Sequence, residues 1–144
     1  MRGRHLIKAW SRTQDSITLS SAEAELVALG KLAMEVLGIR TMCEEWKMSK
    51  EAATSQLFAD ASAALSIANR QGAGKMRHIN VKGLWLQAKA VQQVLKYCKI
   101  KGEENPSDGL TKHVRRELLD KYLGIESLHI KTDRADASLK LAGD

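Results

Sequence analysis

One stretch decides the fold of this chain: Leu19-Ser20-Ser21-Ala22-Glu23-Ala24-Glu25-Leu26-Val27-Ala28-Leu29. It joins a short strand to an amphipathic helix that carries a carboxylate near its start. Ser20 and Glu23 have the spacing of a capping box, in which the serine caps the helix and the glutamate reaches back to the cap amide. The stretch therefore predicts a helix that begins directly after Ser20 and bears Glu25 close to its start.

Two further carboxylates lie at similar boundaries between elements. Asp60 ends the apolar stretch Leu57-Phe58-Ala59, and Asp108 follows Asn105-Pro106-Ser107. A magnesium ion that clamps a phosphate needs hard oxygen ligands that converge from different elements. Glu25, Asp60 and Asp108 thus predict a metal-dependent site for phosphodiester chemistry.

Each of these acids also has a purely structural interpretation. Glu25 could be an acid that the helix dipole favours, and Asp60 could cap the helix that follows it. Asp108 could be a first-turn acid, because Asn105 fits an N-cap and Pro106 fits the first helical position. The residues alone leave both interpretations open.

Four blocks of the sequence, in this order and at this spacing, resemble the ribonuclease H domain of copia-type retrotransposon Pol polyproteins. The blocks are residues 19–29, 57–64, 77–81 and 107–112. The resemblance runs from about residue 10 to about residue 125. It implies that Glu25, Asp60 and Asp108 are catalytic metal ligands for Mg²⁺ or Mn²⁺, and that the parent activity hydrolyses the RNA strand of RNA·DNA hybrids. In such two-metal chemistry, one ion activates water and the other neutralises the departing 3′-oxygen.

The family has one more acid, an aspartate on the opening strand of its sheet, ahead of the helix glutamate. No residue before Glu25 matches it, since Asp15 belongs to the stretch 13–16, which is expected to be a turn. We therefore expect an N-terminally truncated domain with weakened or lost metal binding that is inactive or nearly so alone. The expected partner is an RNA·DNA hybrid or other nucleic acid, and upstream reverse-transcriptase segments are a further candidate. The alternative is a non-enzymatic nucleic-acid-binding or helical interaction remnant in which the acids serve only as caps.

Hydrophobic periodicity predicts alternating strands and helices. Strands are expected at 5–10, 16–19, 55–59 and 97–101, and helices from 21 to 46, from 61 to about 72, over 81–95, from 105–106, and over 117–123, where Gly124 closes the last one. A strand followed by a helix indicates a parallel crossover. The prediction is an α/β domain over 1–130, a ribonuclease H-like mixed sheet flanked by helices that lacks its first strand or strands, followed by a disordered tail at 131–144.

Composition limits the size and the partners of the protein. The 144 residues, 44% of them hydrophobic and 4% aromatic, suffice for one domain with an aliphatic core. Twenty-three basic against 17 acidic residues give a net charge of +6, which favours phosphate polymers. The alternative is that the basic side chains only solvate helix faces. The residues expected to contact an RNA·DNA hybrid are Lys75, Arg77, His78, Lys82 and Lys112.

The cysteines and the hydropathy pattern indicate where in the cell the protein is expected. Cys43 and Cys98 lack the spacing of metal ligands and fit small buried side chains. The sequence contains neither a signal segment nor an apolar run of the roughly 18 residues that could span a membrane. We therefore expect an intracellular protein, cytoplasmic or nuclear, without a membrane partner.

Overall fold

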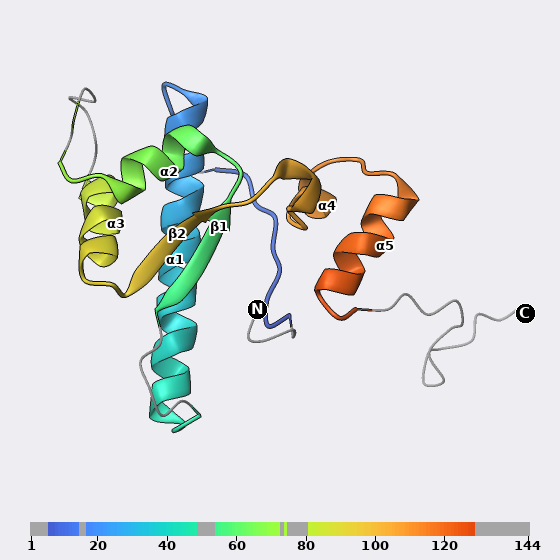
Figure 1. Ribbon diagram of the computed structural model, residues 1–144, viewed down its shortest axis with the longest axis horizontal. Helices are drawn as coiled ribbons and strands as arrows, with labels where there is room; N and C mark the ends of the chain where they lie inside the picture. Colours follow the sequence, from blue (N-terminus) through green and yellow to red (C-terminus); the bar gives the residue numbers. More distant parts are fainter. Residues whose placement is uncertain (1–5, 15–16, 49–53, 73, 75–80, 129–144) are drawn as a thin grey trace, which may run out of the picture. The chain divides into compact units, whose positions relative to one another are not determined.

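The computed structural model describes residues 6–14, 17–48, 54–72, 74 and 81–128 (Figure 1). The chain divides into two compact units. The larger unit is Arg12–Asn105, and the smaller unit combines Met1–Ser11 with Pro106–Asp144. The candidate ligands Glu25 and Asp60 belong to the larger unit, and Asp108 belongs to the smaller one.

The larger unit is an α/β arrangement. Along the chain it contains α1 (Ser21–Glu45), β1 (Ser55–Ala59), α2 (Ser62–Asn69), α3 (Val81–Val91), β2 (Leu95–Lys99) and a short 3₁₀ helix (Gly102–Glu104). β1 and β2 pair in parallel, with Ser55 opposite Leu95 and Ala59 opposite Lys99. Because parallel strands need a crossover connection, α2 and α3 lie between them in the sequence.

The three helices cover one face of this strand pair. Leu57 of β1 and Leu95 and Tyr97 of β2 are buried, whereas Phe58 on the opposite face is 52% exposed. Figure 1 shows α1, α2 and α3 beside the two strands. The core cluster draws on all five elements and comprises Leu26, Leu29, Ala33, Leu57, Ala64, Leu65, Ile67, Ala68, Leu86, Leu95 and Tyr97.

Two buried polar side chains beside this core, those of Gln87 and Tyr97, have hydrogen-bond partners. The Gln87 amide group donates to the carbonyl oxygens of Ile67 (2.9 Å) and Gly72 (3.1 Å), and its oxygen accepts the Gly72 N–H (2.9 Å). The Tyr97 hydroxyl donates to the Leu86 carbonyl oxygen (2.9 Å). Burial raises the pKa of the Tyr97 phenol, so this donor keeps its proton. Gln87 thereby ties the end of α2 to α3, and Tyr97 ties β2 to α3.

The smaller unit contains α4 (Asp108–Thr111) and α5 (Arg116–Ile125). Tyr122 of α5 is buried. A Cβ atom added to Gly109 of α4 would lie 3.4 Å from the Tyr122 ring and 3.7 Å from the Leu119 side chain. The absence of a side chain at Gly109 therefore lets α4 lie close against α5.

Three helices end in the same way. Lys47, Gln93 and Ser127 follow α1, α3 and α5 with φ angles of 54°, 56° and 56°, in the left-handed region. In each case the next amide donates to the carbonyl oxygen five residues earlier, at 2.8–3.1 Å. This is a Schellman motif, which usually has glycine at the left-handed position. The sequence gives no glycine signal at these three ends.

Several predicted elements are confirmed. The long helix begins after Ser20, the strand at 55–59 has the predicted bounds, and the connection between the strands is a parallel crossover. The helices expected after Asp60 and from Val81 are α2 and α3. Cys43 is buried, as expected, and Cys98 is partly buried.

Other boundaries were wrong. Of the strands predicted at 5–10 and 16–19, residues 5 and 16 lie outside the described residues, and residues 6–10 and 17–19 form no strand. In the described part of the chain, no neighbouring strand supplies ladder hydrogen bonds to them. The Schellman motif ends α3 at Val91, so β2 starts at Leu95 and not at Tyr97. α5 runs through Gly124 for the same reason, since its left-handed residue is Ser127. The predicted tail at 131–144 lies outside the described residues.

Candidate metal and nucleic-acid site

Glu25 lies in the second turn of α1, after a helix start that Ser20 caps. The Glu23 N–H donates to Ser20 Oγ (3.2 Å), and Glu23 Oε2 accepts the N–H of Leu19 (2.8 Å), one residue before the predicted cap amide. Ser20 and Glu23 therefore satisfy the start of the helix. Among the described residues, none forms a hydrogen bond or an ion pair with the exposed Glu25 carboxylate.

This position weakens the purely structural interpretation of Glu25. The field of a helix dipole falls off within the first turn, and the first-turn acid of α1 is Glu23. Gln14 Nε2 donates to the Ala24 carbonyl oxygen (2.6 Å) and fastens the preceding segment to the helix start. Glu25 thus stands on a well-fixed backbone with a carboxylate that the described fold leaves unused.

Asp60 directly follows the carboxyl end of β1 and is partly buried. The N-cap of α2 is Ala61, and no side chain caps this helix. The capping role considered for Asp60 is therefore wrong. Within the part of the chain that the structure describes, the Asp60 carboxylate has neither a hydrogen bond nor an ion pair.

A lysine that the sequence did not single out lies at the same turn. Lys99 Nζ donates to the Asp60 backbone oxygen and to Ser62 Oγ, the latter at 2.8 Å. The parallel register causes this, since Lys99 is opposite Ala59 at the ends of the two strands. The sequence could have indicated this contact, because side chains alternate along β2 and Lys99 therefore lies on the same face of the strand as Tyr97. Lys99 fixes the turn between β1 and α2 and brings a positive charge close to Asp60.

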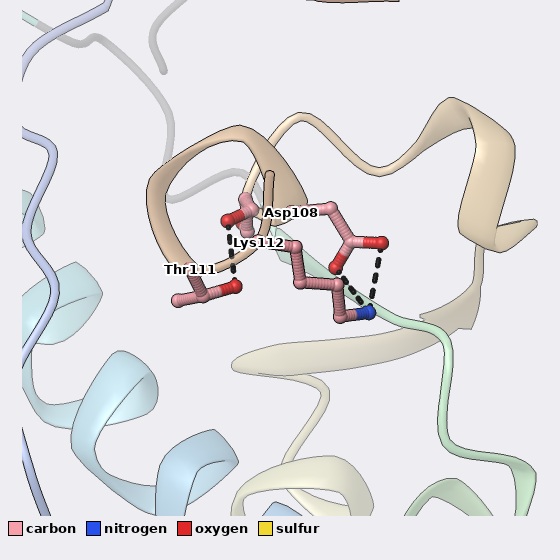
Figure 2. A network of polar contacts seen from close by, with 4 residues as sticks. Asp108, Thr111 and Lys112 are labelled. Carbon is pink, nitrogen blue, oxygen red and sulfur yellow. Dashed lines mark hydrogen bonds and ion pairs between the residues drawn. The ribbon is translucent and has the colours of Figure 1, made fainter. Parts of the chain in front are cut away.

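Asp108 is the first residue of α4 and makes a local ion pair. Its Oδ1 and Oδ2 atoms each lie 3.0 Å from Lys112 Nζ. Figure 2 shows both contacts as dashed lines. The Asp108 side chain is 20% exposed and that of Lys112 is 62% exposed. The predicted helix start at Asn105 and Pro106 is wrong, because these residues precede a turn and α4 begins two residues after Pro106. The interpretation of Asp108 as a first-turn acid is confirmed.

The basic residues expected to contact nucleic acid are described only in part. Lys82 lies at the start of α3 and is exposed. Lys112 is exposed as well, although its ammonium group is engaged with Asp108. Lys75, Arg77 and His78 lie outside the described residues. Exposed ammonium groups of this kind suit phosphate contacts, which require charge and reach but no base recognition.

The acids fit a hard divalent cation in their chemistry. Carboxylate oxygens are preferred ligands of Mg²⁺ and Mn²⁺, and Glu25 and Asp60 have lone pairs that no described residue uses. Within the described parts of either unit, no three side chains of His, Cys, Asp or Glu lie close enough together to hold a metal ion. The larger unit therefore offers two suitable donors and the smaller unit offers one.

Sequence similarity to a known protein indicates the origin of this chain. The chain is similar to a transposon polyprotein. It is 28% identical, over 121 residues, to the retrovirus-related Pol polyprotein from transposon TNT 1-94 of Nicotiana tabacum. The match covers 81% of this chain and 9% of that polyprotein. No family model and no solved structure matches the chain.

This similarity supports a retrotransposon-derived domain. It agrees with the Pol polyprotein part of the resemblance that the four sequence blocks carry. The ribonuclease H assignment within that polyprotein remains a prediction, and so do the three metal ligands. Among the described residues, no helix combines the length and apolar character that crossing a membrane requires.

Proposed function

We propose that this chain is a ribonuclease H-like domain of a retrotransposon Pol polyprotein, with a parent activity that hydrolyses the RNA strand of RNA·DNA hybrids. One observation carries the proposal: Glu25 and Asp60 stand at the start of a helix and the end of a strand, with carboxylates that nothing described in the fold employs. Acids that have no structural partner at such boundaries suit metal coordination. The similarity to the transposon Pol polyprotein adds support.

In this proposal Glu25, Asp60 and Asp108 are the ligands of Mg²⁺ or Mn²⁺. The metal would activate water and neutralise the leaving oxygen of the phosphodiester. Lys99 keeps the turn that carries Asp60 in place through its two hydrogen bonds. Lys82 and Lys112 supply positive charge for the hybrid backbone, which positions the duplex without reading its sequence.

The second candidate is a non-enzymatic nucleic-acid-binding domain. The Asp108–Lys112 ion pair favours it, because an acid engaged in this way has a local structural role. In that case the acids need no metal, and binding of nucleic acid depends only on salt. The two candidates therefore differ in their requirement for a divalent cation.

A titration of the full chain with Mn²⁺ tests the proposal. Asp60→Asn is compared with Asp120→Asn, which removes the same charge from an exposed aspartate in α5 whose nearest basic partner, Arg116, lies 3.9 Å away. If the proposal holds, the chain binds Mn²⁺, and Asp60→Asn lowers its Mn²⁺ affinity by more than about tenfold, the loss typical of changing a residue that only contacts a metal ligand. Asp120→Asn leaves the Mn²⁺ affinity unaltered. Hybrid binding that depends on salt but not on Mn²⁺, in a chain that takes up no Mn²⁺, would support the second candidate instead.

A further inference from the structure

The outer edge of β1, on the side away from β2, has no strand partner among the described residues (Figure 1). In a parallel pair, alternate residues of each strand direct their backbone groups to the other strand. The Ser55 N–H donates to the Val94 carbonyl oxygen, and the Ala59 carbonyl oxygen accepts the Ile100 N–H, both at 3.1 Å. The first, third and fifth residues of β1 therefore direct their backbone groups to β2.

The two residues between them, Gln56 and Phe58, direct their backbone groups to the outer edge. Within the described part of the chain, the N–H and C=O groups of these two residues form no hydrogen bond. Both side chains lie on the face of the sheet that the helices leave open, and Phe58 is 52% exposed. Extended backbone with free donors and acceptors at this spacing is complementary to another β-strand.

The outer edge of β2 is protected, unlike that of β1. Asn69 Nδ2, at the end of α2, donates to the outward-facing Tyr97 carbonyl oxygen (3.4 Å). Lys96 adds an exposed charge to β2, and lysines on edge strands discourage pairing with a further strand. The five residues of β1, Ser55–Ala59, include neither a charged residue nor a proline. The β1 edge therefore lacks the features that prevent strand addition.

The spacing of the free groups on β1 suits a second copy of the same edge. When two β1 strands meet antiparallel with Leu57 on the twofold axis, Gln56 of each copy lies opposite Phe58 of the other. Opposite residues of this kind exchange both of their N–H···O bonds, so the contact satisfies the free backbone groups of both copies. The two Phe58 side chains become diagonal neighbours, about 7–8 Å apart, which aromatic rings can bridge.

We propose that the outer edge of β1 is a dimerisation site at which a second copy of this chain adds its own β1, antiparallel and centred on Leu57. The contact joins the two strand pairs into one sheet, and no charged side chain of β1 opposes it. An edge of five residues buries less surface than the roughly 1,200–2,000 Å² of stable interfaces, so the dimer is expected to dissociate on dilution. This inference does not depend on the metal ligands.

Analytical ultracentrifugation of the full chain over roughly 5–500 μM tests the proposal, since this range covers weak association. The mass of the wild type should rise from 15.9 kDa toward twice that value with concentration. Gln56→Pro removes the outward N–H at a position where an edge strand tolerates proline. It should raise the dissociation constant of the dimer by more than about tenfold, because the symmetric contact loses this hydrogen bond twice. Gln56→Ala is the matched control, since it keeps the N–H, and should dimerise like the wild type.

A second pair of variants leaves the backbone unchanged, so it decides the test if Gln56→Pro does not fold. Phe58→Glu brings two like charges together across the contact and should also raise the dissociation constant by more than about tenfold. Phe58→Leu keeps an apolar side chain at the same position and should still dimerise. Circular dichroism shows whether each variant is folded.

Two results would overturn the inference. A wild type that stays monomeric over the whole range contradicts it, even if the edge captures an extended peptide, because the occupant is then not a second copy. A dimer that folded Gln56→Pro and Phe58→Glu form as readily as their controls uses another surface and contradicts it equally. Neither result affects the proposed ribonuclease H function, which the Mn²⁺ titration tests separately.

Discussion

The starts of α1 and α4 both carry a candidate metal ligand, yet they engage their acids differently. At α1, Ser20 and Glu23 form the capping contacts, and Glu25 has no polar partner among the described residues. At α4, no side chain caps the helix, and Asp108 forms an ion pair with Lys112 within the same turn. The described contacts at the start of α1 leave the Glu25 carboxylate unengaged, whereas those at the start of α4 engage the Asp108 carboxylate.

The largest expected effect on stability is the difference between substitutions at Leu26 and at Glu25. Leu26 is 6% exposed and belongs to the core, so Leu26→Ala should lower the free energy of unfolding by about 2–5 kcal/mol. Glu25→Ala should change it by less than about 0.5 kcal/mol, because the side chain is exposed and has no described partner. Urea unfolding followed by circular dichroism measures both variants. A large loss of stability in Glu25→Ala would give this residue a structural role and break the contrast with Asp108.

The capping box at α1 provides the next largest effect. Ser20→Ala removes the acceptor of the Glu23 N–H and should destabilise the larger unit by about 0.5–2 kcal/mol. Ser21→Ala is the matched control, because Ser21 lies inside the helix and takes no part in the described cap. Thermal unfolding of the two variants compares them directly. Equal midpoints of thermal unfolding in the two variants would mean that Ser20 does not stabilise the start of the helix that carries Glu25.

The ends of α1, α3 and α5 share one left-handed conformation, unlike the starts of α1 and α4. Gln93 adopts a left-handed conformation after α3, which costs a residue with a Cβ atom more than it costs glycine. Gln93→Gly should therefore raise the free energy of unfolding by about 0.5–1 kcal/mol. Gln92→Gly, one residue earlier, should lower it. Denaturant midpoints test this pair, and a destabilised Gln93→Gly would contradict the strain assigned to this position.

The smallest effect belongs to the ion pair at α4. Asp108→Asn should cost about 0.3–0.5 kcal/mol at low salt, as exposed pairs at this spacing do. The difference from the wild type should vanish near 1 M salt, where screening acts over only about 3 Å. Calorimetric unfolding at the two salt concentrations tests this. A loss above 2 kcal/mol at either concentration would show that Asp108 is needed for folding and would weaken its assignment as a ligand.

The fold was predictable where its signals are local. The capping residues before α1, the apolar run of β1 and the helical periodicity of α3 each carry enough information in a few neighbouring residues. The segments at 6–10 and 17–19 were mistaken for strands because a strand is stabilised by its partner, which alternation alone does not reveal. Helix ends at Val91 and Ile125 were missed because Gln93 and Ser127 hold a conformation normally signalled by glycine.

The candidate site was predictable in its residues but not in its contacts. The sequence marked Glu25, Asp60 and Asp108 through their places at element boundaries. It did not indicate that Lys99 reaches the turn at Asp60, because this contact depends on the register of two strands about forty residues apart. Nor did it indicate that Lys112, expected to contact nucleic acid, pairs with Asp108 in the free chain.

The role of Glu25 as a metal ligand is tested most directly by the Mn²⁺ affinity of Glu25→Gln, measured beside that of Glu23→Gln. The two variants remove the same charge at positions two residues apart, and glutamine preserves a capping box at position 23. We expect Glu25→Gln to weaken Mn²⁺ binding by more than about tenfold and Glu23→Gln to retain the wild-type affinity. Equal affinities in the two variants would contradict the assignment of Glu25 as a metal ligand.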